Sequence, residues 1–196
     1  VRQNGDAVGW LTIEGLVDQP LVYKNNTFYL THDFYSKKNV SGALFVDEKH
    51  PLRQDTQNLL VYGHNMKDGS MFGRLIHYTE NNFLHSHYTV RLETRFESFT
   101  YLIFAVDKVS TDYHSRNFLY FWGYPAFNSE NEFNQYISDV YAHSLYTRYL
   151  DVDYSDTLLT MATCLNESRL VLFARRLRED ETEADIQHAL LGLYRK

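Results

Sequence analysis

The sequence predicts a mainly β protein, folded as a closed or nearly closed barrel of about eight strands with peripheral helices. Aromatic residues make up 16% of the chain, with 16 Tyr and 13 Phe, and aromatic side chains favour the half-buried surface of a sheet. Short apolar or alternating segments, separated by polar turns, recur along the chain. Because many strands would otherwise expose unpaired edges, we expect the sheet to close on itself.

Nine segments have the length and composition of strands, with few signals of the long crossovers that parallel pairing requires. The charged stretch between the sixth and seventh segments suits a hairpin connection. The segments are residues 8–13, 21–23, 27–30, 42–46, 58–62, 88–94, 100–109, 157–163 and 169–175.

A helix is predicted over residues 129–144, between the strand segments 100–109 and 157–163. Ser129 and Glu132 have the spacing of a capping box, in which two side chains satisfy free backbone N–H groups at the helix start. One face of this helix is apolar and consists of Phe133, Ile137, Val140 and Tyr141.

Two further helices are expected. A short one follows Asp68 and Gly69, because Phe72, Leu75 and Ile76 share one helical face. The other is C-terminal, about residues 180–194, with acidic residues near its start and basic residues at its end, the order that the helix dipole favours.

The composition is that of one folded domain over residues 1–196, with the barrel at about residues 8–177. Hydrophobic residues are 44% and charged residues 22% of the chain, which excludes intrinsic disorder, and no repeat or linker marks a domain boundary. The net charge of -6 lacks the basic character of a nucleic-acid-binding protein. The longest apolar runs are about five residues, far short of the roughly 20 that a spanning helix needs.

Cys164 is the single cysteine, so it forms no internal disulfide and no multi-cysteine metal site. It ends a predicted strand, and strand ends present reactive groups, although a lone cysteine also serves often as a small buried hydrophobe. A nucleophilic thiol needs a base or cation nearby and a donor for the oxyanion. Arg169 begins the next strand, so a hairpin would place it beside Cys164, while we expect Arg175 and Arg176 at the other end of that strand to tolerate lysine.

The nine histidines offer many candidate bases. His85 and His87, with His77 nearby, have a spacing that a metal site could use, but no Cys or acidic ligand matches it, so surface histidines explain them better. His64 differs because it follows a buried strand and precedes a polar turn. We therefore expect no metal, and a candidate base at His64.

These residues stand in motifs that resemble those of class B sortases. Residues 62–72 (YGHNMKDGSMF) resemble the histidine motif of that family, and the TC at 163–164 followed by RLVLFA from residue 169 resembles its cysteine and arginine strands. The resemblance covers most of residues 4–177. It extends through VGWLTI at 8–13, N-x-x-Y-L at 26–30, GALFVD at 42–47 and a helix placed between the sixth and seventh strands of the barrel.

The resemblance implies a transpeptidase on the outer face of a Gram-positive cell membrane, anchored by an N-terminal membrane segment that would precede Val1. Cys164 would be the nucleophile, His64 the general acid and base, and Arg169 the donor to the oxyanion or to the substrate backbone. Such enzymes cleave a sorting signal after its threonine, hold the product as a thioester and pass it to an amine, without a cofactor. Four matching positions would line the signal groove, although each could equally be scaffold: Asn26, Leu30, Tyr62 and Thr163.

Two departures from the family pattern concern substrate details. Ala162 stands where class B members usually have serine, and the turn of residues 165–168 is shorter than is common. Anchoring of surface proteins to peptidoglycan and polymerisation of pilin through a lysine amine both stay open. A non-catalytic barrel that binds a cell-surface peptide or glycan is the alternative of another class, and it has no need for Cys164 beside a cation.

Overall fold

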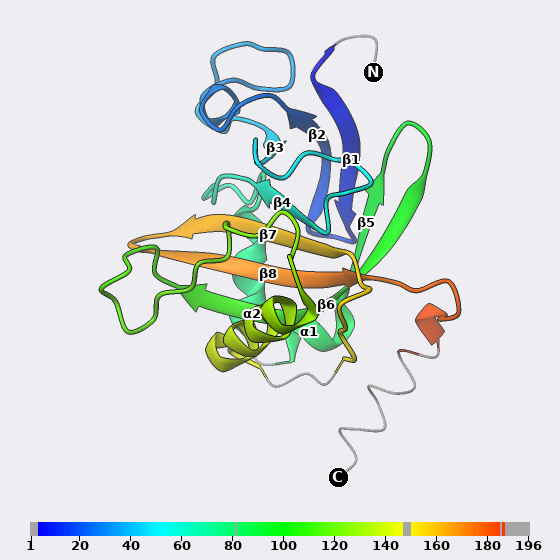
Figure 1. The fold of residues 1–196 in the computed structure, drawn as a ribbon. Helices are drawn as coiled ribbons and strands as arrows, with labels where there is room; N and C mark the ends of the chain where they lie inside the picture. Colours follow the sequence, from blue (N-terminus) through cyan, green and yellow to red (C-terminus); the bar gives the residue numbers. More distant parts are fainter. Residues whose placement is uncertain (1–3, 81, 147–149, 185, 187–196) are drawn as a thin grey trace.

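The computed structural model describes residues 4–80, 82–146, 150–184 and 186. Eight strands form a closed barrel in the order β1-β2-β3-β4-β7-β8-β6-β5, as the sequence predicts (Figure 1). Their bounds are β1 Ala7–Ile13, β2 Val17–Tyr23, β3 Leu44–Val46, β4 Asn58–Tyr62, β5 Thr89–Glu93, β6 Ser98–Val109, β7 Leu158–Leu165 and β8 Ser168–Arg176.

The prediction of a strand at residues 27–30 is wrong. Residues 27–30 form the 3-10 helix η1 (Phe28–Leu30) instead. The Oδ1 atom of Asn25 accepts hydrogen bonds from the backbone N–H groups of Thr27 and Phe28, which turns the chain locally and competes with sheet pairing.

Two of the strand pairs are parallel, which the sequence did not predict. β2 pairs with β3, and β4 pairs with β7, in parallel register, while the other neighbours are antiparallel. The second pair runs from Asn58 opposite Leu158 to Tyr62 opposite Ala162. Because the strands are parallel, β4 and β7 both end at the same rim of the barrel.

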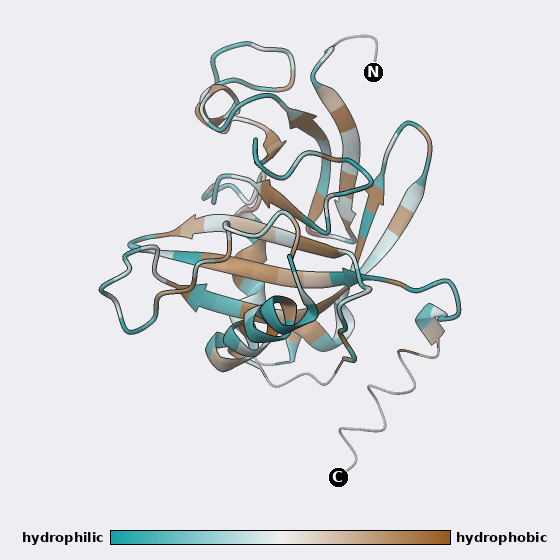
Figure 2. Cartoon of the chain, in the orientation of Figure 1, coloured by the Kyte–Doolittle hydropathy of each residue, from teal (hydrophilic) through white to brown (hydrophobic). Residues whose placement is uncertain are grey.

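β7 and β8 are buried on both faces, which explains their nearly continuous apolar sequences. Along β8, Leu170, Leu172 and Ala174 belong to the barrel interior, whereas Val171 and Phe173 face a second core outside it. Figure 2 shows hydrophobic colouring along the middle of β8 and hydrophilic colouring on the outer surface of the covering helix.

The covering helix is α2 (Glu130–His143), which confirms the predicted helix. Ser129 accepts a hydrogen bond from the Glu132 N–H at 3.2 Å, as the capping box requires. Glu132 accepts in return from the N–H of Asn128 rather than from that of Ser129. Four buried side chains attach the helix to the second core, namely Phe133, Tyr136, Ile137 and Val140.

The remaining helices are short. The helix expected after Gly69 is the 3-10 helix η2 (Gly73–Thr79), and α1 (Phe83–Ser86) follows it without having been predicted. Most of the C-terminal helix expected at about residues 180–194 lies outside the described residues. Within the described part of the chain, no helix has the length and apolar character needed to cross a membrane.

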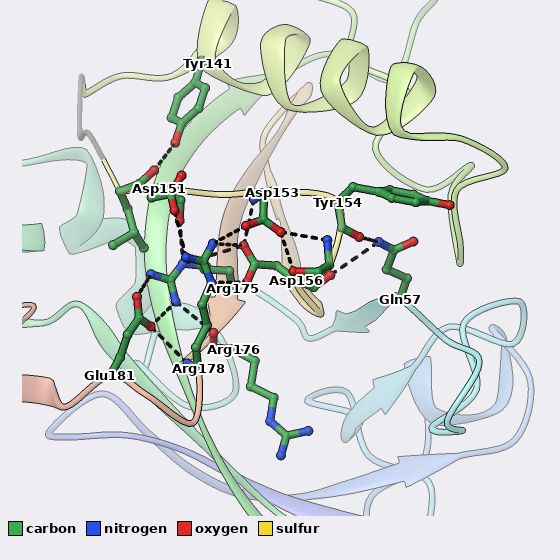
Figure 3. A network of polar contacts seen from close by, with 12 residues as sticks. Gln57, Tyr141, Asp151, Asp153, Tyr154, Asp156, Arg175, Arg176, Arg178 and Glu181 are labelled. Carbon is green, nitrogen blue, oxygen red and sulfur yellow. Dashed lines mark hydrogen bonds and ion pairs between the residues drawn. The ribbon is translucent and has the colours of Figure 1, made fainter.

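A network of charged side chains fastens the segment after β8 to the loop before β7 (Figure 3). Arg178 binds Asp151, Asp153 and Asp156 at 2.8–3.0 Å. Arg175 is fully buried and donates two hydrogen bonds of 2.6 Å to Glu181. These contacts change the expectation for Arg175, and we now expect Arg175→Lys to cost stability, because lysine offers no planar fork for two parallel bonds.

Candidate active site

Three neighbouring strand ends bring Cys164, His64 and Arg169 together. Tyr62 of β4 pairs with Ala162 of β7. His64 follows Tyr62 by two residues, and Cys164 follows Ala162 by two residues, so both lie beyond the same end of this parallel pair. The antiparallel pairing of β7 with β8 then sets Arg169 directly opposite Cys164. Because adjacent strands lie only about 4.8 Å apart, the three side chains share one rim of the barrel.

A pocket of about 390 Å³ opens at this rim and is lined by all seven residues that the sequence singled out. Its walls are mostly apolar and aromatic, which is typical of sites that bind an extended ligand with a few polar contacts. The lining residues are Asn26, Leu30, Phe45, Tyr62, Gly63, His64, Thr111, Phe121, Trp122, Ala162, Thr163, Cys164 and Arg169.

Cys164 is a free, exposed thiol, so it does not act as a small buried hydrophobe. The turn after Cys164 has only two residues, Asn166 and Glu167, because Leu165 and Ser168 still pair across the hairpin. The turn is therefore shorter than the four residues, 165–168, expected from the sequence. Asn166 has a φ of 53°, in the left-handed region that Asn tolerates, and this tight turn fixes Cys164 opposite its neighbour on β8.

Arg169 is half-buried, and most of its donors have no partner among the residues that the structure describes. Its Nη1 atom donates to the carbonyl of Ser168 at 3.2 Å. It has no ion pair with any carboxylate in the described parts of the chain. Burial raises the pKa of the Tyr62 hydroxyl, and the negative charge of Asp47 raises it further. The guanidinium of Arg169 lowers this pKa by a smaller amount. Tyr62 therefore presents a protonated hydroxyl near the Arg169 cation.

His64 is oriented by a backbone carbonyl. Its Nε2 atom lies 2.7 Å from the carbonyl oxygen of Leu30, at the end of η1. Since a carbonyl only accepts, Nε2 carries the hydrogen of this bond and leaves Nδ1 for proton exchange. The strand end before it is tightly packed, because a Cβ on Gly63 would clash with the side chains of Leu44 and Phe72.

Two of the predicted groove residues are also bound to the scaffold. Asn26 donates to Asp47 at 2.7 Å and accepts from the N–H of Glu48 at 2.9 Å. The hydroxyl of Thr163 donates to the carbonyl of Gly63 at 2.7 Å, which joins the ends of β7 and β4. Their amide and hydroxyl groups therefore stabilise the rim, and contact with a substrate stays a prediction for both.

Sequence reasoning missed part of the pocket wall. Phe45 faces it from β3, while Thr111, Phe121 and Trp122 come from the connection between β6 and α2. The only signal for the latter is the aromatic run FLYFW at 118–122, which has no strand or helix periodicity.

The histidines of the metal alternative lie apart from this site. His77 contacts Glu80, and His87 stacks on Phe83 with ring centroids 4.1 Å apart. Among the residues described, no three His, Cys, Asp or Glu side chains are placed to hold a metal ion.

Comparison with known proteins identifies the family. Residues 11–177 match the sortase domain. Sortase B of Listeria monocytogenes is 34% identical over 85% of this chain and sortase B of Staphylococcus aureus 25% identical over 82%; the chain spans 65% and 64% of their lengths. The solved structure of sortase B from Listeria monocytogenes has a TM-score of 0.79 and 32% identity, covering 89% of this chain and 96% of that one. The chain therefore belongs to the sortase family, and within it to class B.

Proposed function

We propose that this protein is a cysteine transpeptidase that cleaves a C-terminal sorting signal after its threonine and transfers the acyl group to an amine. The observation that carries the proposal is the meeting of Cys164, His64 and Arg169 at three adjacent strand ends of one pocket. A thiol, an imidazole and a guanidinium meet the needs of acyl transfer without a cofactor.

In the first step, the thiolate of Cys164 attacks the carbonyl carbon of the signal threonine and forms a carbon–sulfur bond. The electron pair moves to the carbonyl oxygen, where Arg169 donates hydrogen bonds to the developing negative charge. Collapse of this intermediate breaks the peptide bond, and His64 gives a proton to the departing amine. The enzyme then holds the product as a thioester.

In the second step, an amine attacks the thioester carbonyl and gives a proton to His64. Cys164 leaves as a thiolate, and a new amide bond forms. Water can replace the amine, which makes hydrolysis a side reaction. The Asn26, Leu30, Tyr62 and Thr163 positions would contact the signal peptide in the pocket.

Membership of the sortase family supports a setting in the cell envelope. We place the enzyme on the outer face of the cell membrane of a Gram-positive bacterium, held by an N-terminal anchor. Its partners would be secreted surface proteins with a sorting signal and an amine from a peptidoglycan precursor. Polymerisation of pilin subunits through a lysine amine is the alternative reaction at the same site.

Product analysis tests the reaction and separates the alternatives. The enzyme is incubated with LPxTG-like and NPxTN-like peptides, together with either a peptidoglycan-type amine or a lysine-containing pilin peptide. Mass spectrometry should show a new amide bond to one of the two amines. Unchanged peptides throughout the panel would instead favour a binding barrel without catalysis.

A further inference from the structure

His50 is a fully buried histidine whose two ring nitrogens both face backbone carbonyls. Its Nδ1 atom lies 2.7 Å from the carbonyl oxygen of Asn58, at the start of β4. Its Nε2 atom lies 3.1 Å from the carbonyl oxygen of Trp122, 72 residues further along the chain. The ring therefore stands between the barrel wall and the aromatic connection that covers one side of the pocket.

A carbonyl oxygen accepts and never donates, so a bond from Nε2 to the carbonyl of Trp122 needs hydrogen on Nε2. Asp47 lies beside the same nitrogen, with Oδ1 4.0 Å from Nε2 and a side chain that is itself buried.

Asp47 in turn holds a second residue of the pocket lining, Asn26. Its second oxygen, Oδ2, accepts the hydrogen bond from Asn26, which lines the pocket. A continuous chain of polar contacts thus runs from Asn26 through Asp47 and His50 to the carbonyl of Trp122. Trp122 and Asn26 both line the pocket, whereas His50 and Asp47 do not.

The contact with Trp122 is separate from another attachment of this connection. The carbonyl of Pro125 accepts from the N–H groups of Gln57 and Asn58 at 2.8 and 3.0 Å. These bonds do not involve His50. Loss of the histidine contact would therefore remove a polar tether of the Trp122 backbone while the connection stays attached at Pro125 and through its packing on the second core.

We propose that His50 is a positioning residue that holds the Trp122 wall against the Asn26 wall and so sets the width of the signal groove. This inference rests on the proposed transpeptidase function. Since His50 touches neither Cys164 nor the pocket, its contribution is to the affinity for the peptide and not to the nucleophile.

Two conservative variants separate the two bonds of His50. The amide nitrogen of glutamine corresponds to Nε2 and that of asparagine to Nδ1. His50→Gln should keep the donor to Trp122 and a KM for the signal peptide within about twofold of wild type. His50→Asn should lose that donor and raise KM by at least about fivefold, at nearly unchanged kcat, because one hydrogen bond is removed. His77→Gln, at a half-buried histidine that does not line the pocket, is the control and should change neither constant.

Alkylation of Cys164 by iodoacetamide is measured in parallel and should proceed at the wild-type rate in all variants. Equal KM values for His50→Asn and His50→Gln would overturn the proposal. In the wild-type protein, ¹⁵N NMR should show hydrogen on Nε2 of His50, and an Nε2 without hydrogen would overturn the proposal without any variant. Failure of the wild type to form a thioester would instead refute the transpeptidase function itself.

Discussion

Arg169 differs from Arg175 and Arg178 in having no carboxylate partner among the described residues. Substitution of Arg169 by lysine keeps the positive charge but replaces a planar fork of donors by one compact point charge. Loss of an oxyanion donor costs on the order of a hundredfold to a thousandfold in rate. Arg169→Lys should therefore slow peptide cleavage by at least about tenfold, measured as kcat/KM, with little change in Tm.

Arg176→Lys is the matched control for that change. Arg176 is exposed, and its side chain points away from the carboxylates that bind its neighbours (Figure 3). The control should keep wild-type kinetics. If Arg169→Lys also kept them, the arginine would have no part in the mechanism, and backbone amides near Cys164 would have to stabilise the oxyanion.

His64 is the only histidine of the described chain that lines the pocket. Its Nε2 atom is occupied by the carbonyl of Leu30, so its Nδ1 atom is the one available to a substrate. His64→Ala should abolish turnover, whereas His85→Ala and His87→Ala should stay near the wild-type rate. Steady-state cleavage assays check this prediction. Loss of activity on adding a strong chelator, or in a folded His85→Ala protein, would point to a metal mechanism instead.

At the scale of elements, α2 depends on its N-terminal cap. The Ser129 hydroxyl satisfies the N–H of Glu132, which would otherwise lack a partner in the first turn. Ser129→Ala should cost about 1 kcal/mol in the free energy of unfolding and lower Tm by about 2–4 °C. Thermal unfolding followed by circular dichroism measures the shift.

Asn134→Ala serves as the comparison for the cap. Asn134 is exposed in the middle of the same helix, and alanine favours helix there, so its Tm should stay equal or rise slightly. A loss of stability as large as that of Ser129→Ala would show that the cap is not the cause.

Local patterns predicted the elements far better than they predicted their pairing. Apolar periodicity and the capping box depend only on residues close together in the sequence. They were therefore sufficient to predict the strands at 58–62 and 169–175 and the helix at 129–144. Residues 27–30 were misassigned because the side chain of Asn25 turns the backbone. The parallel pairing of β4 with β7 joins segments 100 residues apart, and no local pattern contains it.

The same distinction applies to the site. Cys164 and Arg169 lie on one hairpin, so spacing alone indicated their proximity. His64 was found through its motif, and its position beside Cys164 follows only from the parallel pair. Trp122 was missed because its segment is irregular, and it reaches the pocket through packing and the contact with His50.

For the whole molecule, two carboxyl groups give opposite contributions to the dependence of stability on pH. Asp107 is fully buried, and its oxygens have no hydrogen-bond partner in the described structure, so burial raises its pKa well above the ordinary value. The unfolded chain therefore releases this proton at lower pH than the folded one. Its contribution to stability falls as the pH rises above the unfolded pKa.

Glu181 has the reverse sign, because the hydrogen bonds from Arg175 lower its pKa. Its stabilising contribution is present above the unfolded pKa and is lost as the pH falls through the lowered one. Thermal unfolding between about pH 3 and pH 8 separates the two groups. Relative to wild type, Asp107→Asn should gain stability as the pH rises, and Glu181→Gln should lose stability over the same range.

A pH-independent difference between Asp107→Asn and wild type would contradict a buried, protonated carboxyl at this position. If the difference in stability between Glu181→Gln and wild type also did not change with pH, the network in Figure 3 would not favour the ionised glutamate.

The central claim is that Cys164 carries the acyl group, and intact-protein mass spectrometry tests it most directly. The enzyme is mixed with the panel of LPxTG-like and NPxTN-like peptides without an added amine and is then quenched in acid. A covalent adduct with the mass of the peptide fragment ending at threonine should form on the wild type, and its peptide sequence identifies the signal. The adduct should be absent from Cys164→Ala. No adduct with any peptide of the panel, or an adduct that persists in Cys164→Ala, would contradict the transpeptidase mechanism.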